Sequence, residues 1–175
     1  DEIVQRVRER SRRLAAGLPV LQPPLGSDFS LNGVVPLPET FRPAAVLVPL
    51  VRREPGVTVL LTQRTEDMPS HAGQIAFPGG RKQAEDADAK DTALREASEE
   101  IGVDPATVRV LGELTPVHVV VSGFTLHPVI GVTDERPVFV AAPGEVDEIL
   151  EVSLDDLRDA ARIGRDIRIR EGVAV

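Results

Sequence analysis

The 175-residue sequence predicts an α+β fold, with a mixed β-sheet around one central helix, in a single domain over residues 1–175. Three observations support this class. Hydrophobic residues make up 42% of the chain, which is enough for one real core. Several short runs are β-rich and bounded by turn residues, and an amphipathic helix stands between them. No internal repeat or low-complexity block divides the chain.

The N-terminal part, residues 1–43, is expected to hold a helix followed by a segment that wraps the domain. Apolar residues have helical spacing among many Arg and Glu residues within 2–16. The basic side of this helix is more simply a solvated face than a membrane or anion patch. Six prolines within residues 18–43 are too many for a continuous helix or a central strand, so we expect an extended connection there.

The rest of the chain is predicted to alternate strands with two helices. Pro55-Gly56 marks a turn, and the β-rich runs on either side of it are expected to form a hairpin. Ser153 is expected to be the N-cap of a last helix that ends near Ala161. Residues 116–124 are expected to be a loop that can close over a ligand. The predicted strands cover residues 44–51, 57–62, 74–77, 108–115, 126–132 and 138–141, and residues 166–170 alternate like an edge strand.

The central helix is predicted over residues 92–101 and ends at Gly102, because a residue without Cβ readily adopts the left-handed conformation that ends a helix. Four apolar side chains form one stripe, while Glu96, Glu99 and Glu100 point to a separate face. Like charges at positions i and i+4, as in Glu96 and Glu100, cost an isolated helix roughly 0.2–0.5 kcal/mol. The acidic face therefore indicates that a cation offsets the repulsion.

This cation is expected to come from solution. Arg95 is placed to pair with Glu99 and to point away from the cleft between Glu96 and Glu100. Several carboxylates on one rigid face suit Mg²⁺ or Mn²⁺, which keep some waters and bind phosphates on their open side. A Phe-Pro-Gly-Gly turn at residues 77–80 precedes the helix, and its glycines let the backbone approach a ligand. The alternative is a solvated acidic face without a ligand.

The region of this helix resembles a known family motif. Residues 95–103 read REASEEIGV and resemble the core of the Nudix box, G-x5-E-x7-R-E-U-x-E-E-x-G-U, in which U is aliphatic. These nine positions fit, except that Ala97 stands at the first U. Counted back from the box arginine, the box glycine falls on Arg81 and the first glutamate on Ala87, so Gly80 lies one residue too early.

The same one-residue insertion and an upstream signature resemble the coenzyme A pyrophosphatase branch of the Nudix hydrolases. Residues 60–80 read LLTQRTEDMPSHAGQIAFPGG, close to the branch pattern L-L-T-x-R-x-x-x-[LM]-x-x-H-x-G-x-[IV]-x-F-P-G-G. The box region occupies residues 79–103. The resemblance implies a Nudix-type α/β/α sandwich with a mixed sheet. It also implies metal-dependent hydrolysis of the diphosphate bond of coenzyme A or its derivatives, giving phosphopantetheine and 3′,5′-ADP.

The resemblance also implies a ligand set for Mg²⁺ or Mn²⁺. It makes Glu96 and Glu100 the primary ligands, with Glu99 a third ligand or a water-mediated contact. The carbonyl of Gly80 is a further candidate ligand. Arg95 is expected to orient the carboxylates rather than to touch the substrate.

Family members often take a further glutamate from a distant loop, as a base or a metal ligand. Glu148 is our choice for this role over Glu145 and Glu113. The residues expected to be catalytic are therefore Glu99, Glu100, Arg95 and Glu148. The residues expected to bind substrate phosphates are Arg64, His71 and Arg81. For His71, a hydrogen bond that caps the loop is the alternative role.

The composition limits the partners. A net charge of −8 argues against a nucleic-acid-binding surface, because phosphate backbones are held by clustered Lys and Arg. The absence of cysteine excludes disulfides, thiolate zinc sites and cysteine nucleophiles. No apolar run approaches 18 residues, so no membrane span is expected. We expect a cytoplasmic protein, a small nucleotide as its substrate, and possible assembly as a homodimer.

Two other functions stay open at this point. The Nudix box alone would also permit a broader pyrophosphatase that acts on ADP-ribose or dinucleotides. A non-catalytic nucleotide-binding module is a third hypothesis. Three intact glutamates on one helical turn argue against such a module, because a pure binder gains nothing from their repulsion.

Overall fold

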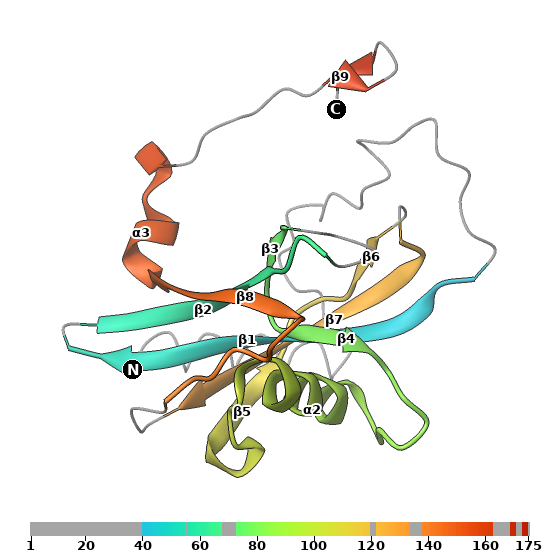
Figure 1. The fold of residues 1–175 in the computed structure, drawn as a ribbon, viewed down its shortest axis with the longest axis horizontal. Helices are drawn as coiled ribbons and strands as arrows, with labels where there is room; N and C mark the ends of the chain where they lie inside the picture. Colours follow the sequence, from blue (N-terminus) through green and yellow to red (C-terminus); the bar gives the residue numbers. More distant parts are fainter. Residues whose placement is uncertain are drawn as a thin grey trace.

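The computed structural model describes residues 40–54, 56–67, 73–119, 122–133, 138–162, 169–170 and 173–174. The predictions for residues 2–16, for most of the wrapping segment and for His71 lie outside these ranges. Figure 1 shows a mixed sheet with helices on two sides. Its eight strands are β1 (Arg42–Arg53), β2 (Gly56–Arg64), β3 (Ile75–Ala76), β4 (Gly79–Arg81), β5 (Val108–Glu113), β6 (Val117–Val119), β7 (Phe124–Thr133) and β8 (Val146–Ser153). The helices are α2 (Ala89–Ile101) and α3 (Leu154–Arg158), the 3₁₀ turns are η2 (Pro105–Thr107) and η3 (Ala160–Arg162), and β9 (Ile169–Arg170) pairs with β10 (Val173–Ala174).

Strand β1 is the centre of the sheet. It runs parallel to β7 along one edge. Its other edge is shared, because β2 pairs with residues 50–53 and β4 pairs with residues 44–46, both antiparallel. The sheet order is β3-β2-β1-β7-β5, with β8 on β2 and β6 on β7. This arrangement confirms the predicted hairpin and the α+β class with a mixed sheet.

Strand β1 contains two prolines, Pro43 and Pro49. It begins at Arg42, two residues before the predicted start, and so includes Pro43. The N–H of Leu47 donates to the carbonyl of Pro78 (2.8 Å), and the N–H of Lys82 donates to the carbonyl of Pro43 (3.1 Å). Pro43 therefore turns its missing N–H toward a position just past the end of β4. Pro49 falls between the part of β1 that pairs with β4 and the part that pairs with β2. The strand accepts both prolines because neither position needs the N–H for its ladder.

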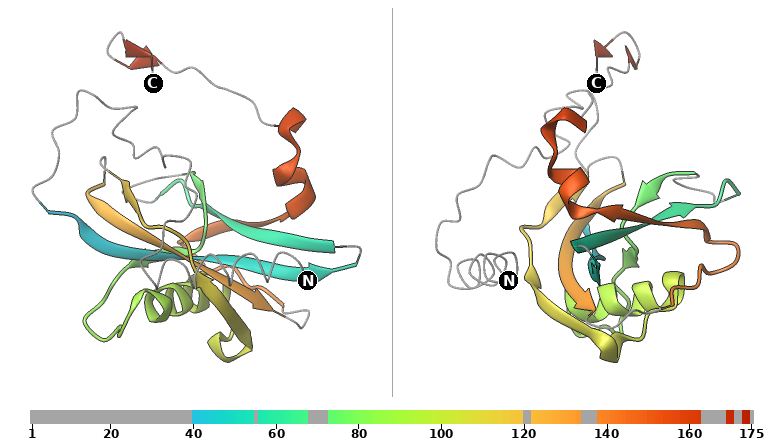
Figure 2. Two further views of the ribbon diagram at one scale, coloured as in Figure 1. Left: turned by 180° about the vertical axis from the view of Figure 1, so that it is seen from behind. Right: turned by 90° about the vertical axis from the view of Figure 1, so that its left-hand side faces the viewer.

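Each face of the sheet has its own hydrophobic cluster. Helix α2 packs Ala93, Ala97 and Ile101 against Leu47 and other side chains of one face. On the other face, a cluster from β1, β2, β5 and β7 includes Leu154 at the start of α3. Figure 2 shows α2 and α3 on opposite sides of the strands. The arrangement is the layered sandwich that was predicted. None of the described helices combines the length and apolar character that a membrane crossing needs.

Some local predictions were wrong at their boundaries. Helix α2 begins at Ala89, three residues before the predicted start. Helix α3 begins after Ser153 as predicted but ends at Arg158 rather than near Ala161. Residues 79–80, predicted as part of a turn, lie in β4, and β6 lies within the predicted loop at 116–124.

The segment before β8 differs most from the prediction. Residues 138–141 do not form the predicted strand, while β8, at residues 146–153, was not predicted. The backbone of this segment contacts the end of α2 instead. The N–H of Val140 donates to the carbonyl of Ile101 (3.0 Å), and the N–H of Ala142 donates to that of Glu100 (2.9 Å). These bonds satisfy carbonyls that a helix end leaves unpaired.

Candidate active site

Helix α2 is fixed at both ends by capping residues. The N-cap Asp88 has an extended backbone, and its carboxylate accepts a bond from the N–H of Asp91 (2.9 Å). At the other end, Gly102 has a φ of 69° and its N–H donates to the carbonyl of Ser98 (3.1 Å). The acidic side chains between these caps therefore project from a rigid element.

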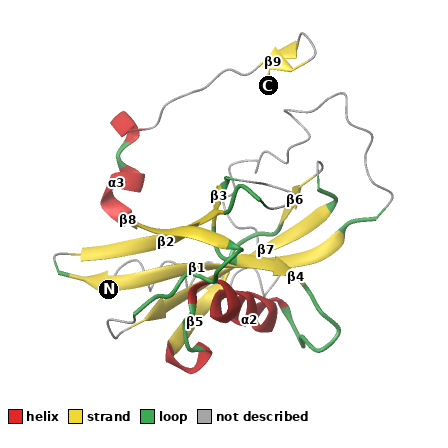
Figure 3. Cartoon of the chain, viewed as in Figure 1, coloured by secondary structure: helices red, strands yellow, loops and turns green. Residues whose placement is uncertain are grey.

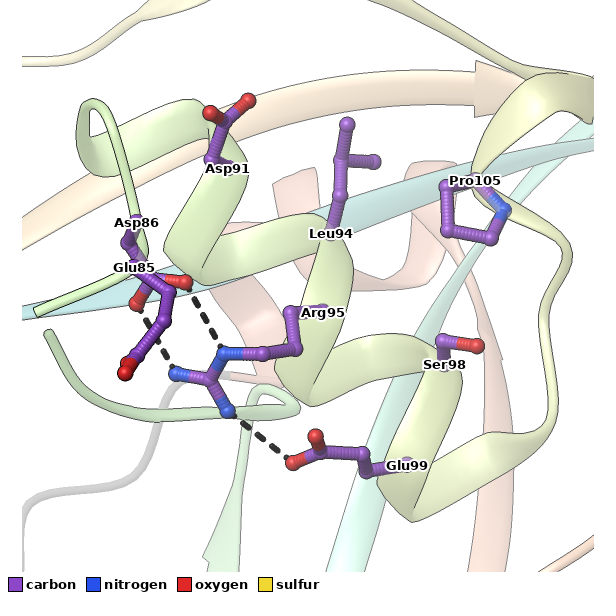
Figure 4. Close-up of a pocket in the computed structure, with 8 residues that line it drawn as sticks. All are labelled: Glu85, Asp86, Asp91, Leu94, Arg95, Ser98, Glu99 and Pro105. Carbon is purple, nitrogen blue, oxygen red and sulfur yellow. Dashed lines mark hydrogen bonds and ion pairs between the residues drawn. The ribbon is translucent and has the colours of Figure 1, made fainter. Parts of the chain in front are cut away.

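One side of α2 carries paired charges centred on Arg95. Its Nε and Nη2 donate to the two carboxylate oxygens of Asp86, both at 3.0 Å, and its Nη1 lies 3.0 Å from a carboxylate oxygen of Glu99. Figure 4 shows these contacts in a shallow pocket beside the helix, whose lining includes neither Glu96 nor Glu100. The Arg95 guanidinium holds the pKa of Asp86 well below its usual range. On this side Arg95 is thus paired with two carboxylates, Asp86 and Glu99.

Asp86 was not anticipated from the sequence. It lies one residue before Ala87, the position on which the first glutamate of the Nudix box falls. The loop from β4 to α2 holds it there, because its carboxylate also accepts the N–H of Gln83 (2.8 Å) and the hydroxyl of Thr92 (3.0 Å). Figure 3 shows this loop as the green connection between the two elements. The sequence did contain a signal for Asp86. It is an acidic residue one position before the first glutamate of the box, and the chain has a one-residue insertion in this part of the motif.

The other side of α2 faces β4 and buries Glu100. Only 4% of this residue is exposed. Its carboxylate accepts the N–H of Gly79 (3.1 Å), and Nη1 of Arg64 approaches the other oxygen at 3.5 Å. A buried carboxylate that receives one good hydrogen bond and one long contact is left short of positive charge.

Glu96 lies next to Glu100 on the same side of the helix. Its carboxylate sits against Gly80, where a Cβ would approach it to 2.5 Å, so the absence of a side chain makes room for it. Nη1 of Arg95 also contacts Glu96 at 3.0 Å. The expectation that Arg95 points away from this cleft was therefore wrong. Its guanidinium group is planar with several donors, which lets it reach Asp86 and both glutamates at once.

Burial shifts the titration of both glutamates. It raises the pKa of Glu100 to about 7, with the negative charge of Glu96 adding to the effect, although the N–H of Gly79 and the charge of Arg64 oppose it. Burial also raises the pKa of Glu96, against the charge of Arg95. Desolvation disfavours the ionised form unless a cation compensates. The Glu96–Glu100 pair, as we call it below, is therefore deficient in positive charge.

The register of β4 decides which glycine carbonyl faces the helix. Gly80 pairs with Ala45 of β1, and the backbone bonds on either side of this pair identify it as a hydrogen-bonded pair of the ladder. Its carbonyl is therefore turned to β1. Gly79 belongs to the alternate pair, so its peptide groups point outward, where its N–H meets Glu100. This geometry makes the carbonyl of Gly79, rather than that of Gly80, the candidate ligand.

The residues predicted to bind phosphates are placed differently. Arg64, at the end of β2, lies at the Glu96–Glu100 pair, and its buried Nε has no hydrogen-bond acceptor among the described residues. Arg81 is exposed at the end of β4, where its guanidinium lies 5.2 Å from the ring centroid of Phe124. The structure therefore brings Arg64 to the carboxylates and turns Arg81 toward Phe124 on the other face of the sheet.

The predicted distant glutamate is not brought to the pair. Glu148 pairs with Gln63 in the β2–β8 ladder, and Leu60 of β2 packs on the α2 face. Because side chains alternate along a strand, Gln63 and Glu148 lie on the opposite face. Glu145 precedes β8, and its negative charge contributes to the raised pKa of Glu100. Of the two, Glu145 is the candidate that the structure places near the site.

The side chains present fit a divalent cation with two carboxylate ligands. No group of three acidic, imidazole or thiol side chains within the described ranges converges as a metal cage. The side chain of Glu99 is 55% exposed and turned to Arg95. Glu96, Glu100 and the carbonyl of Gly79 are hard oxygen donors, and Mg²⁺ typically uses one or two carboxylates and keeps several waters. The three-carboxylate site expected from the sequence is thus reduced to two.

Comparison with known proteins places this geometry in a family. The NUDIX domain profile matches residues 41–170. A protein of Pectobacterium atrosepticum named uncharacterized Nudix hydrolase NudL is 43% identical over 136 residues, which cover 74% of this chain and 70% of that protein. The protein of the same name from Yersinia enterocolitica is 39% identical over 145 residues, covering 83% and 68%. The one from Escherichia coli K12 is 44% identical over 125 residues, covering 71% and 62%, so this chain spans about two thirds of such relatives.

Solved structures share the architecture at lower sequence identity. The Nudix hydrolase RenU from M. smegmatis has a TM-score of 0.56 and 24% identity, covering 67% of this chain and 74% of that one. A C. elegans Ap4A hydrolase in a binary complex has a TM-score of 0.55 and 17% identity, covering 70% and 87%. At these identities the likeness concerns the fold alone. With the domain match and the relatives above, it leads to one conclusion: this chain belongs to the Nudix hydrolase family.

Proposed function

We propose that this Nudix hydrolase cleaves the diphosphate bond of coenzyme A or its derivatives with Mg²⁺ or Mn²⁺, giving phosphopantetheine and 3′,5′-ADP. The observation that carries the proposal is the Glu96–Glu100 pair, a buried and a half-buried carboxylate with raised pKa beside Gly79 and Gly80. A diphosphate adds further negative charge, so this pair can accept it only together with divalent cations. The same charge deficiency argues against a module that binds nucleotides without metal.

The reaction is a displacement at phosphorus. The oxygen of a water molecule attacks one phosphorus of the P–O–P bridge, the bond from that phosphorus to the bridging oxygen breaks, and the other phosphate leaves. A bound divalent ion supplies charge neutralisation and lowers the pKa of its water. Glu96, Glu100 and the Gly79 carbonyl would hold it. Arg64, whose guanidinium group lies at Glu100 and is partly exposed, would donate to a non-bridging phosphate oxygen.

Two acidic residues have supporting roles in this proposal. Arg95 positions Glu96 and holds Glu99, which we assign to a water-mediated contact rather than to direct ligation. Glu145 would take the proton from the attacking water, in place of Glu148. Its support is its electrostatic coupling to Glu100 and its position on a segment bonded to the end of α2.

Support for coenzyme A comes from the signature at residues 60–80. In the structure Leu60 lies in the core against α2, Arg64 lies at Glu100, and the final glycines form the start of β4. Arg64 and the final glycines of the signature thus lie at the carboxylates, while Leu60 supports them from the core. A role in substrate choice agrees with this position, since residues around the reacting bond can also contact the groups attached to it.

A substrate panel tests the proposal. The protein is incubated with Mg²⁺ and coenzyme A, ADP-ribose or NADH, and products are separated by chromatography. We expect coenzyme A to be cleaved fastest, to phosphopantetheine and 3′,5′-ADP. Much faster cleavage of ADP-ribose would overturn the coenzyme A assignment in favour of a broader pyrophosphatase. No cleavage with either Mg²⁺ or Mn²⁺ would overturn the hydrolytic function.

A cytoplasmic location and a homodimer complete the proposal. Cell fractionation checks the first, and light scattering of the purified protein checks the second.

A further inference from the structure

A second group of charged and aromatic side chains lies at the end of β4, on the face of the sheet opposite α2. Phe124, at the start of β7, is contacted by two arginines. The guanidinium carbon of Arg42 lies 4.4 Å from its ring centroid and that of Arg81 lies 5.2 Å from it. We call these three residues the Phe124 cluster. Cations at such distances are attracted to the electron-rich face of an aromatic ring.

The strand register explains why these residues meet. Arg42 and Phe124 are direct partners in the β1–β7 pair, and Arg81 is the partner of Ala44 in the β1–β4 pair. Residues 42 and 44 lie on one face of β1, and their partners Phe124 and Arg81 lie on the same face of the sheet. All three members of the cluster therefore share this face. Ala44 is buried and has only a methyl group, which leaves Arg81 free to extend across β1 to the ring.

The two arginines of the cluster differ in their partners from three arginines on β1, β2 and α2. Arg53, Arg64 and Arg95 each contact a carboxylate. Within the described ranges neither arginine of the cluster does so, although the chain has 28 acidic and 20 basic residues. Arg42 makes one long bond to the carbonyl of Ser122 (3.4 Å). The ring therefore orients two guanidinium groups and leaves most of their N–H donors free for an anion at its edge.

We propose that the Phe124 cluster binds a phosphomonoester of the substrate, distinct from the diphosphate that is cleaved. Two cations match the charge of about −1.5 to −2 that a phosphomonoester carries at pH 7, whereas a carboxylate would balance one of them. Its three oxygens also suit two forked guanidinium groups. The proposal rests on the proposed function for the identity of the substrate, since coenzyme A carries one phosphomonoester.

The position of the cluster relative to the Glu96–Glu100 pair fits an extended substrate. Gly80 meets Glu96 on the α2 side of the sheet, and the next residue, Arg81, points to the opposite face. In the described residues β4 pairs with β1 alone, and on its outer edge the N–H of Gly79 donates to Glu100. A group attached to the diphosphate reaches the Phe124 cluster by passing this edge.

Calorimetric titration of the protein in the presence of Ca²⁺ tests the proposal with a divalent cation at the carboxylates, and chromatography checks that the ligand stays intact during the titration. The matched ligands are coenzyme A and dephospho-coenzyme A, which differ only in the phosphomonoester. We expect the wild-type protein to bind coenzyme A about 10-fold more tightly. In Arg42→Gln and in Arg81→Gln this ratio is expected to fall toward one. Arg158→Gln, an equal loss of charge at an exposed site on α3, is the control and keeps the ratio.

Phe124→Leu provides a second variant, because it keeps apolar volume and removes the ring face. It is expected to lower the ratio while the thermal unfolding temperature shows that the protein still folds. A wild-type ratio of one would overturn the proposal. So would arginine variants that weaken both ligands equally, since that outcome means a general loss of charge or structure.

A second ligand pair separates this proposal from the proposed function. Adenosine 3′,5′-bisphosphate and AMP differ by the same phosphomonoester and need no hydrolysis. If coenzyme A is not cleaved but the bisphosphate binds more tightly through Arg42 and Arg81, the anion site stands and the proposed function fails. If coenzyme A is cleaved and neither ratio depends on these arginines, the anion site fails alone.

Discussion

The two sides of helix α2 use the same kinds of residues with opposite results. On the outer side, Arg95 is bound by Asp86 and Glu99, and the charges are paired within the protein. On the side facing β4, Glu100 is buried and Glu96 half-buried, with partial compensation from Arg95 and Arg64. Burial raises the pKa of both glutamates there, and it raises the pKa of Glu100 to about 7.

This difference separates a structural network from a site that needs a ligand. Charge pairs with good geometry fix the helix and its arginine, as on the outer side. Buried carboxylates without enough cations oppose folding unless something from solution completes them. The four experiments below test whether the two sides of α2 differ in this way.

The largest effect is expected from Glu100→Gln. It removes a ligand charge from the Glu96–Glu100 pair and should lower turnover of the cleaved substrate about 10³-fold or more, beyond the roughly 10- to 100-fold typical of changes around a metal site. Glu99→Gln, on the outer side, is the matched control and should cost about 10-fold or less. Circular dichroism checks that both variants fold. Equal losses would erase the distinction between the two sides.

Asp86→Asn tests the outer side of α2 through stability. It leaves the half-buried guanidinium of Arg95 without its main carboxylate, so the free energy of unfolding should fall by about 2–3 kcal/mol. Urea denaturation measures this change. Glu85→Gln alters an exposed carboxylate of the same pocket and should stay within about 0.5 kcal/mol. An unchanged stability in Asp86→Asn would show that Asp86 does not support the helix.

The pH dependence of stability tests the other side. The pKa of Glu100 rises from 4.5 to about 7 on folding, so between these values the folded state binds more protons than the unfolded state. The stability of the metal-free protein should therefore fall as pH rises through this window, by about 2 kcal/mol. Urea denaturation in EDTA from pH 4.5 to 7.5 measures the slope.

Glu100→Gln should flatten this slope, and Mg²⁺ at pH 7.5 should restore stability to the wild-type protein. Asp86 has a lowered pKa, so its contribution stays present throughout the same window. A wild-type stability that rises with pH through the window would contradict the assignment of Glu100.

The smallest effect is expected from Gly80→Ala. Its Cβ would lie 2.5 Å from the carboxylate of Glu96 and should displace it. The Mg²⁺ concentration for half-maximal activity should then rise several-fold, about 1 kcal/mol. Gly56→Ala is the matched control, because an added Cβ there meets nothing within 4 Å. An unaltered Mg²⁺ requirement would place Glu96 outside the ligand set.

Local signals in the sequence predicted much of the fold. Pro55-Gly56 and Ser153 marked the hairpin and the start of α3, and Gly102 marked the end of α2, because each acts through its own backbone. Strand β8 was not predicted because acidic residues interrupt its apolar pattern. Residues 138–141 were misassigned because their valines are apolar yet exposed, with Val138 at 83%.

The site was predictable to the extent that it lies on one helix. The shared side of Glu96 and Glu100 follows from helical spacing. The partner of Arg95 does not, because Asp86 reaches it through the fold of a loop. The choice between the glycine carbonyls needs the strand register, and so does the placement of Glu148 on the far face.

The hydrogen bonds from Val140 and Ala142 to the last turn of α2 bear on how related enzymes can come to act on different substrates. They fasten the incoming segment, while the N–H of Thr65 on the neighbouring strand end holds the carbonyl of Glu145 (3.2 Å). Among the described residues, the short turn between Ala142 and Glu145 lies between these anchors, and the hydroxyl of Thr65 donates to the carbonyl of Gly144 at its tip (3.1 Å). An insertion there would re-aim one acidic side chain and leave the helix undisturbed, so new specificities can arise without rebuilding the scaffold.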